Sequence, residues 1–96
     1  MTGYVLSPAA QADMEDIWRY SMQRWSITRA ERYVLAIRDA CEDLVAGTLI
    51  GQDARDIRAG YHRLKVGSHV LFFRRSHDVI DVVRILHQRM DWPNRL

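Results

Sequence analysis

Residues 61–86 read YHRLKVGSHVLFFRRSHDVIDVVRIL, and this stretch decides the fold class. It contains three runs of six to eight residues rich in Val, Ile, Leu and Phe, each typical of a β-strand. Gly67-Ser68 separates the first run from the second, and Ser76-His77-Asp78 separates the second from the third. Because connections this short join neighbouring antiparallel strands, the stretch predicts a three-stranded meander.

Two amphipathic helices are predicted before the meander. Ser7-Pro8 supplies an N-cap and a proline suited to the first helical position, and residues 8–25 carry apolar side chains at helical spacing. After a break at residues 26–28, a second apolar stripe runs up to Gly47, where a left-handed residue commonly ends a helix. The short connection predicts an antiparallel helical hairpin.

Tyr4–Leu6 is a short apolar run that we expect to join the sheet as a further strand, whereas residues 48–60 are turn-like. The predicted order is therefore β-α-α-β-β-β. This order predicts an α+β fold, with an N-terminal helical hairpin packed on a small, curled, mostly antiparallel sheet. Segments follow one another closely, without a linker or repeat, so residues 1–96 are expected to form a single domain.

The composition is that of an ordinary globular domain, with 48% hydrophobic and 27% charged residues. No apolar run approaches the ~20 residues that cross a bilayer, and Ser7-Pro8 interrupts the N-terminus before a signal peptide develops. The single cysteine, Cys41, excludes an intramolecular disulfide. We expect a cytoplasmic protein that does not enter membranes.

Charge is distributed unevenly along the chain. Residues 1–50 carry five basic and seven acidic side chains, whereas residues 51–96 carry nine basic and five acidic ones. A basic half suggests an acidic partner surface or nucleic acid. The alternative is that arginines on exposed strand faces keep the sheet soluble, and the charge pattern leaves both interpretations open.

Four local motifs, in order and at natural separations, carry a resemblance to a known family. They are LSPAA at residues 6–10, DMEDIWRY at 13–20, IRAGYHR at 57–63 and the closing motif RILHQRMD at 84–91. Together with the predicted element order, they make essentially the whole chain resemble the ParE branch of the RelE/ParE toxin superfamily.

This resemblance implies a toxin of a type II toxin–antitoxin system, of the kind that stabilises plasmids. ParE-like proteins inhibit DNA gyrase by trapping it on cleaved DNA, and a ParD-like antitoxin neutralises them. The antitoxin typically joins a dimeric DNA-binding domain to a flexible tail that folds onto the toxin. The resemblance therefore implies a protein inhibitor with no cofactor, no catalytic residue and no sequence-specific binding to nucleic acid.

Side chains at the basic end of the sheet and in the tail are the predicted contacts to the target. Trp92 has two interpretations, since an exposed tryptophan suits an interface, but its ring could instead fold back and close the sheet. The predicted contact residues are Arg74, Arg84, His87, Arg89 and Trp92.

An antitoxin helix is expected to occupy an apolar groove between the helical hairpin and the sheet, because a chain this small leaves apolar surface uncovered. The predicted groove residues are Trp18, Met22, Leu35 and Phe72.

The alternative function is that of RelE-like relatives, which cleave messenger RNA on the ribosome. Such cleavage needs basic side chains, histidine or tyrosine, which this chain supplies as Tyr61, Arg63, Arg74, Arg84 and His87. The tail lacks the tyrosine or lysine expected of a RelE-like enzyme, and this departure counts against cleavage.

No metal site and no cysteine chemistry are predicted. The histidines His62, His69, His77 and His87 are dispersed, and none forms a helical pair or pairs with Cys41. Cys41 lies on the apolar stripe of the second predicted helix, where cysteine is usually a small buried hydrophobe.

Overall fold

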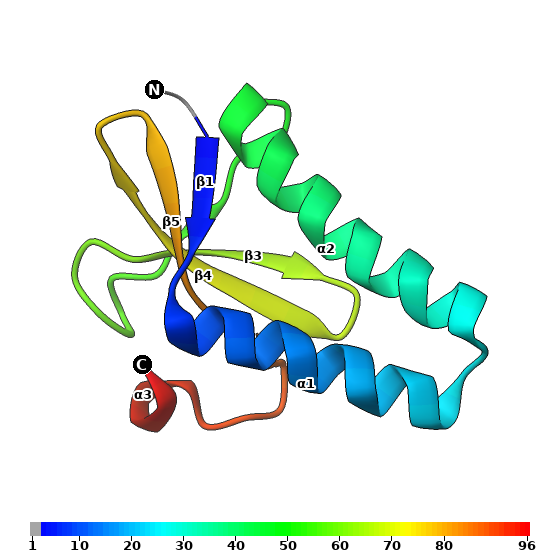
Figure 1. Ribbon diagram of the computed structural model, residues 1–96. Helices are drawn as coiled ribbons and strands as arrows, with labels where there is room; N and C mark the ends of the chain where they lie inside the picture. Colours follow the sequence, from blue (N-terminus) through cyan, green and yellow to red (C-terminus); the bar gives the residue numbers. More distant parts are fainter. Residues whose placement is uncertain (1–2) are drawn as a thin grey trace.

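The structure, a computed structural model that describes residues 3–96, is a five-stranded sheet with two long helices against one face (Figure 1). Its elements are β1 (Gly3–Leu6), α1 (Pro8–Arg24), α2 (Ile27–Ala46), β2 (Gln52–Asp53), β3 (His62–Val66), β4 (His69–Ser76), β5 (Val79–His87) and α3 (Trp92–Arg95). The predicted α+β class and helical hairpin are confirmed, while β2 and α3 are additional elements. Met1 and Thr2, which the single-domain prediction includes, lie outside the described residues.

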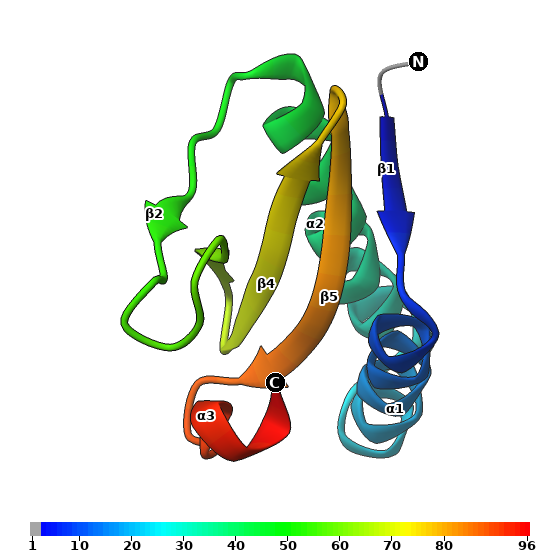
Figure 2. The same ribbon diagram turned by 90° about the vertical axis from the view of Figure 1, so that its left-hand side faces the viewer.

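The sheet has the strand order β1-β5-β4-β3-β2. The first strand of the chain therefore lies beside the last one, as Figure 2 shows, and the two run parallel. Every other pair is antiparallel, which confirms the predicted meander and the mostly antiparallel sheet. β1 pairs with β5 only as far as Leu6, opposite Val82, so the remainder of β5 needs other partners along that edge.

The helix ends follow the capping residues in the sequence. The Ser7 hydroxyl accepts a hydrogen bond from the Ala10 N–H at 3.0 Å and donates one to the Val83 carbonyl at 2.7 Å. Ser26 caps α2 in the same way, and Gly47 ends that helix at φ 82°. Ser7 therefore both starts α1 and fixes it to β5, because Val83 lies at the irregularity in the pairing of β4 with β5.

Two apolar clusters lie on opposite faces of the sheet. The larger one packs sheet residues such as Leu71 and Phe73 against Ile37 and Leu44 of α2. The smaller one lies on the outer face, where the tail covers the sheet. It contains Val70, Phe72 and Leu86, with Trp92 and Leu96 packed over them. The helices thus cover one face of the sheet as expected, and the tail covers part of the other face.

Gly67 forms a crowded turn between β3 and β4. Its φ is +60°, and a Cβ built there would lie 2.8 Å from the Tyr33 ring. At the other tight turn, His77 and Asp78 adopt φ values of 49° and 65°, as a two-residue hairpin requires. No helix within residues 3–96 is long and apolar enough to span a membrane.

We predict that Gly67→Ala destabilises the protein more than Gly47→Ala, as measured by urea unfolding. Both positions have positive φ, and a non-glycine residue there costs about 1 kcal/mol or more. At Gly47 nothing lies within 4 Å of the added Cβ, so Gly47→Ala is the matched control for backbone strain alone. At Gly67 the Tyr33 ring must also move, and we expect a loss of at least about 2 kcal/mol. Equal losses in the two variants would contradict this account.

Candidate functional site

Arg84 of β5 and Asp13 of α1 form a two-point ion pair. Arg84 Nε donates to Asp13 Oδ2 at 2.7 Å, and Arg84 Nη2 donates to Asp13 Oδ1 at 2.8 Å. The third nitrogen, Nη1, donates to the Arg95 carbonyl at 2.8 Å. The hydrogen bonds to Asp13 raise the pKa of Arg84 above its usual range. The guanidinium, whose side chain is 21% exposed, is thus occupied by contacts within the chain.

Asp13 also completes the edge of the sheet where β1 ends. Its Oδ2 accepts the Ile85 N–H at 2.9 Å, and the Ser7 N–H donates to the Val82 carbonyl at 2.9 Å. A helix carboxylate and a cap residue therefore replace the missing strand along β5. Because the Asp13 side chain is only 12% exposed, these donors replace the water molecules that would otherwise bind its oxygens.

Tyr33, His69 and His87 form a chain of contacts beside this ion pair. The Ser68 N–H donates to the Tyr33 hydroxyl at 3.0 Å, and the same hydroxyl is hydrogen-bonded to His69 Nδ1 at 2.7 Å. The His69 ring meets the His87 ring edge-on, with 5.3 Å between centroids. Burial, followed by the nearby His87, lowers the pKa of His69 to about 4. The His69 imidazole is therefore neutral at neutral pH.

Contacts from His87 hold the tail against the sheet. His87 Nδ1 accepts the Arg89 N–H at 3.1 Å, and the His87 carbonyl accepts from Trp92 Nε1 at 3.1 Å. The Trp92 ring packs edge-on against Phe72, with 5.4 Å between centroids. Of the two interpretations of Trp92, the structure therefore favours the ring that folds back and closes the outer face.

The predicted target-contact residues extend from the middle of the β4–β5 hairpin to the tail. Arg84, His87, Arg89 and Trp92 lie at the end of β5 and in the turn that follows it. Arg74 lies two pairs nearer the β4–β5 turn, because Arg84 is opposite Phe72 whereas Arg74 is opposite Asp81, with which it forms an ion pair at 3.1 Å. Arg89 is exposed, whereas His87 and Trp92 are half-buried. Arg89 is thus the most accessible member at the β5 end.

The predicted antitoxin-groove residues also separate. Met22 and Leu35 are exposed on α1 and α2, at 36% and 51%, and Trp18 is half-buried on α1. Phe72 is fully buried and belongs to the outer cluster beneath Trp92. Phe72 does not line a groove beside the helical hairpin, because its side chain points to the face of the sheet that the hairpin does not cover.

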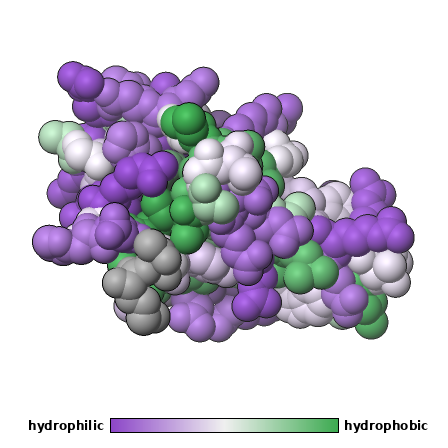
Figure 3. Space-filling view, turned by 90° about the horizontal axis from the view of Figure 1, so that it is seen from above, coloured by the Kyte–Doolittle hydropathy of each residue, from purple (hydrophilic) through white to green (hydrophobic). Residues whose placement is uncertain are grey.

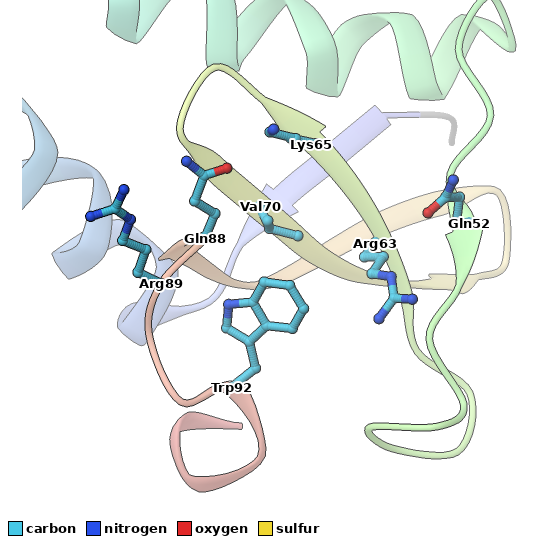
Figure 4. A pocket seen from close by; sticks show the side chains of 7 residues that line it. All are labelled: Gln52, Arg63, Lys65, Val70, Gln88, Arg89 and Trp92. Atoms are coloured by element: carbon cyan, nitrogen blue, oxygen red, sulfur yellow. The ribbon is translucent and has the colours of Figure 1, made fainter.

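Two hollows flank the end of β5. The inner hollow, of about 390 Å³, is bounded by α1, β5 and the tail, and its apolar members are Ile17, Tyr20, Ile85 and Met90. The outer groove, of about 570 Å³, lies on the face opposite the long helices (Figure 4). The outer groove is lined by Gln52, Arg63, Lys65, Val70, Gln88, Arg89 and Trp92. Sequence reasoning missed Lys65 as a site residue, although Arg63 and Lys65 alternate on one predicted strand and must share a face.

Several groups considered for chemistry are held in the interior or in ion pairs. Tyr61 is buried, and Arg63 pairs with Asp56 at 3.4 Å. Burial raises the pKa of the Cys41 thiol to about 11, so this thiol stays protonated at neutral pH. Within residues 3–96, no group of three or more His, Cys, Asp or Glu side chains is placed to hold a metal ion.

Comparison with known proteins identifies the family. Residues 4–92 match the family described as the ParE toxin of the type II toxin–antitoxin system parDE. The chain belongs to this family. Toxin ParE1 of Mycobacterium tuberculosis is 47% identical over 94 residues, which are 97% of this chain and 96% of that protein. Toxin ParE1 of Caulobacter vibrioides is 41% identical over 91 residues, which are 95% of this chain and 94% of that protein.

A solved structure titled "Chromosomal ParDE TA system from P. aeruginosa" shares the fold of this ParE family member. Its TM-score is 0.76 at 21% sequence identity, and the match covers 91% of this chain and 96% of that one. The resemblance drawn from the four sequence motifs is therefore confirmed. The family match includes Asp13, Arg84 and Trp92, the residues that join α1, β5 and the tail.

We predict that Arg84→Ala lowers the free energy of unfolding by about 2–3 kcal/mol, less than for a fully buried pair. The loss arises because Asp13 keeps a mostly buried charge without its two-point partner, and the tail loses its contact with Arg84. Arg84→Lys keeps the charge but not the two-point hydrogen bonding to Asp13, so its loss of unfolding free energy should be intermediate. Chemical denaturation monitored by circular dichroism measures all three proteins.

Arg74→Ala is the matched control, because the Arg74–Asp81 pair is more exposed, at 52% and 29%. We expect it to change stability by less than about 1 kcal/mol. If Arg74→Ala and Arg84→Ala cost the same, the Asp13–Arg84 pair has no special structural role.

We predict that His69 makes the protein less stable as the pH falls from about 6.5 to about 4. In the unfolded chain the imidazole regains its ordinary pKa of 6.5. Between pH 6.5 and about 4 the unfolded chain therefore binds a proton at His69 while the folded protein does not, and this proton binding favours unfolding. The stabilising contribution of neutral His69 is fully present above pH 6.5 and is lost as the pH falls to about 4. Thermal unfolding of wild type and His69→Gln across these pH values should show a shallower decline in the variant. If the stability of wild type and of His69→Gln falls in parallel with pH, the pKa of His69 is not lowered in the folded protein.

Proposed function

We propose that this chain inhibits DNA gyrase by binding to it, as the toxin of a toxin–antitoxin pair that acts in the cytoplasm. The observation that carries the proposal is the match of residues 4–92 to the ParE toxin family, with 47% identity to a named ParE1 toxin. Inhibition of gyrase is the activity that this family resemblance implies. In this proposal the toxin acts as a protein ligand and performs no covalent step.

The geometry of the candidate nuclease groups supports a binding function over RNA cleavage. Phosphodiester cleavage needs a mobile acid or base and a free cation near the scissile phosphate. Arg84 is bound to Asp13 and the Arg95 carbonyl, and His87 accepts the Arg89 N–H. Tyr61 is buried. These contacts serve the fold and the tail, and they leave a cleavage mechanism without an evident proton donor.

We also propose a ParD-like antitoxin as the neutralising partner. One structural neighbour is titled as a ParDE system, and this chain offers separate apolar surfaces on its hairpin. Met22 and Leu35 are exposed, and the inner hollow adds Tyr20 and Met90. In the view from above, apolar atoms form separate small patches among polar side chains (Figure 3). Such an arrangement suits a partner segment that wraps around the toxin and contacts several small patches.

A supercoiling assay with purified gyrase tests the proposed target. We predict that the antitoxin-free protein blocks supercoiling of a relaxed plasmid and that linear DNA appears after treatment with detergent and protease. Linear DNA is expected because a trapped gyrase keeps both strands cleaved until the enzyme is removed. Full supercoiling with folded protein would refute the proposal. A parallel assay with ribosomes and messenger RNA, comparing wild type with His87→Ala, would then test the RelE-like alternative.

A double variant tests whether the antitoxin and gyrase bind to different surfaces of the protein. Met22→Asp/Leu35→Asp changes two exposed side chains far from the tail, so it should inhibit gyrase as the wild type does. Charges on this apolar surface should weaken binding of the antitoxin, and cells that co-express both proteins should then stop growing. Continued growth on co-expression would place the antitoxin elsewhere on the chain.

A further inference from the structure

The outer groove contains two predicted target-contact residues, Arg89 and Trp92, but most of its lining is not explained by the proposed inhibition of gyrase. One wall is the edge formed by β2 and β3, where Gln52 pairs directly with Arg63. The other wall is the turn after β5, where the Gln88 N–H donates to the Ser68 carbonyl at 2.9 Å. Val70 and Trp92 form the floor between them. Because both walls are hydrogen-bonded to the sheet, the groove keeps its shape before any ligand arrives.

The groove is positively charged. Its lining contains Arg63, Lys65 and Arg89 and no carboxylate. In the described part of the chain, Lys65 and Arg89 form no ion pair, and both are exposed. Arg63 meets Asp56 at 3.4 Å, but that carboxylate is 61% exposed and holds the guanidinium weakly. Three cations can thus face one bound anion chain, with the amides of Gln52 and Gln88 as additional donors.

Trp92 adds a flat aromatic surface between the cations. Figure 4 shows its ring in the middle of the groove, with Arg89 on one side and Arg63 on the other. The Arg63 guanidinium carbon lies 5.9 Å from the centre of this ring. The contacts to Phe72 and to the His87 carbonyl fix the ring, so it loses little freedom when another ring stacks on it.

We propose that the outer groove binds the phosphodiester backbone of a single-stranded nucleic acid, with a base stacked on Trp92. Guanidinium and ammonium groups bind phosphates, and an aromatic ring accepts unpaired bases of any kind. An acidic peptide would use the same cations but would offer no flat ring to the indole. A duplex keeps its bases paired, so they cannot reach the floor of the groove. Binding is independent of base sequence, and it goes beyond gyrase inhibition because it requires no gyrase.

Fluorescence anisotropy with short labelled strands of oligothymidylate and oligouridylate tests this proposal without gyrase. We expect saturable binding with a Kd of roughly 10⁻⁴–10⁻⁶ M at physiological salt. The logarithm of the binding constant should fall with the logarithm of salt concentration with a slope of about −2, because each phosphate contact contributes about −0.7. Equal binding of both strands indicates recognition of the shared phosphodiester backbone. A preference for one strand indicates whether the groove binds single-stranded DNA or RNA.

Charge reversal at two exposed positions locates the site. Lys65→Glu/Arg89→Glu should weaken binding at least about tenfold, because two of the three phosphate contacts become repulsive. The matched control is Arg32→Glu/Arg38→Glu on α2, which makes the same change in net charge away from the groove and should keep more of the affinity. A milder variant, Lys65→Gln/Arg89→Gln, avoids acidic side chains and should reduce the salt slope to about −0.7. Circular dichroism verifies that each variant is folded.

Four results would overturn the proposal. The first two are an equal loss of binding in the α2 control and the absence of saturable binding by wild type below about 1 mM. The third is tighter binding of a duplex than of a single strand. The fourth is displacement of the strand by oligoglutamate of the same charge at equal concentration. The last result would assign the groove to an acidic peptide. Because gyrase is absent throughout, failure here leaves the supercoiling result intact, and the reverse also holds.

Discussion

The two-point pair between Asp13 and Arg84 is the interaction on which the arrangement of the chain depends. β1 is too short to cover β5, and the uncovered length of β5 would expose backbone groups at an edge. Asp13 accepts the Ile85 N–H there, and Arg84 donates two hydrogen bonds to the same, mostly buried carboxylate. One pair of side chains therefore attaches α1, the edge of the sheet and, through the Arg95 carbonyl, the tail.

The tail in turn determines how the outer face of the sheet is divided. Where Trp92 and Leu96 cover Val70, Phe72 and Leu86, the face becomes a second small core. Beside it, Arg63 and Lys65 remain on the same face without a cover, and the turn between β5 and α3 brings Arg89 opposite them. The apolar cluster and the basic groove thus have a common origin in the position of one indole ring, which His87 holds through its carbonyl.

Local patterns predicted the elements well, because the signals for them are local. Ser7, Ser26 and Gly47 act at helix ends as their chemistry requires, and the alternation in residues 61–86 is that of strands. The helical hairpin, the meander and the N-terminal strand follow from such signals and from the family resemblance, whereas the parallel direction of that strand was not predicted. β2 was not predicted because a strand of two residues has no periodicity, and α3 was not predicted because a single turn has no apolar stripe.

The site was predicted less well, because its geometry depends on contacts between distant residues. Nothing near Arg84 in the sequence indicates that Asp13, 71 residues away, occupies its guanidinium. Arg74 and Arg84 were grouped by position in the chain, but Arg74 pairs with Asp81 on the neighbouring strand while Arg84 reaches Asp13 on α1, so their partners differ. Lys65 was overlooked because a lone lysine on a strand is unremarkable until the tail is seen to form the opposite wall.

The parallel pairing of β1 with β5 has a consequence for folding during translation. Ser7 bonds to Val83, 76 residues later, so the corner that joins β1 to α1 has no partner while the intervening chain is still being made. At about 5–20 residues per second, that wait lasts roughly 4–15 s. During this time a nascent chain can form its helices and hairpins but cannot close the sheet. The complete fold becomes possible only after nearly all of its residues have been translated.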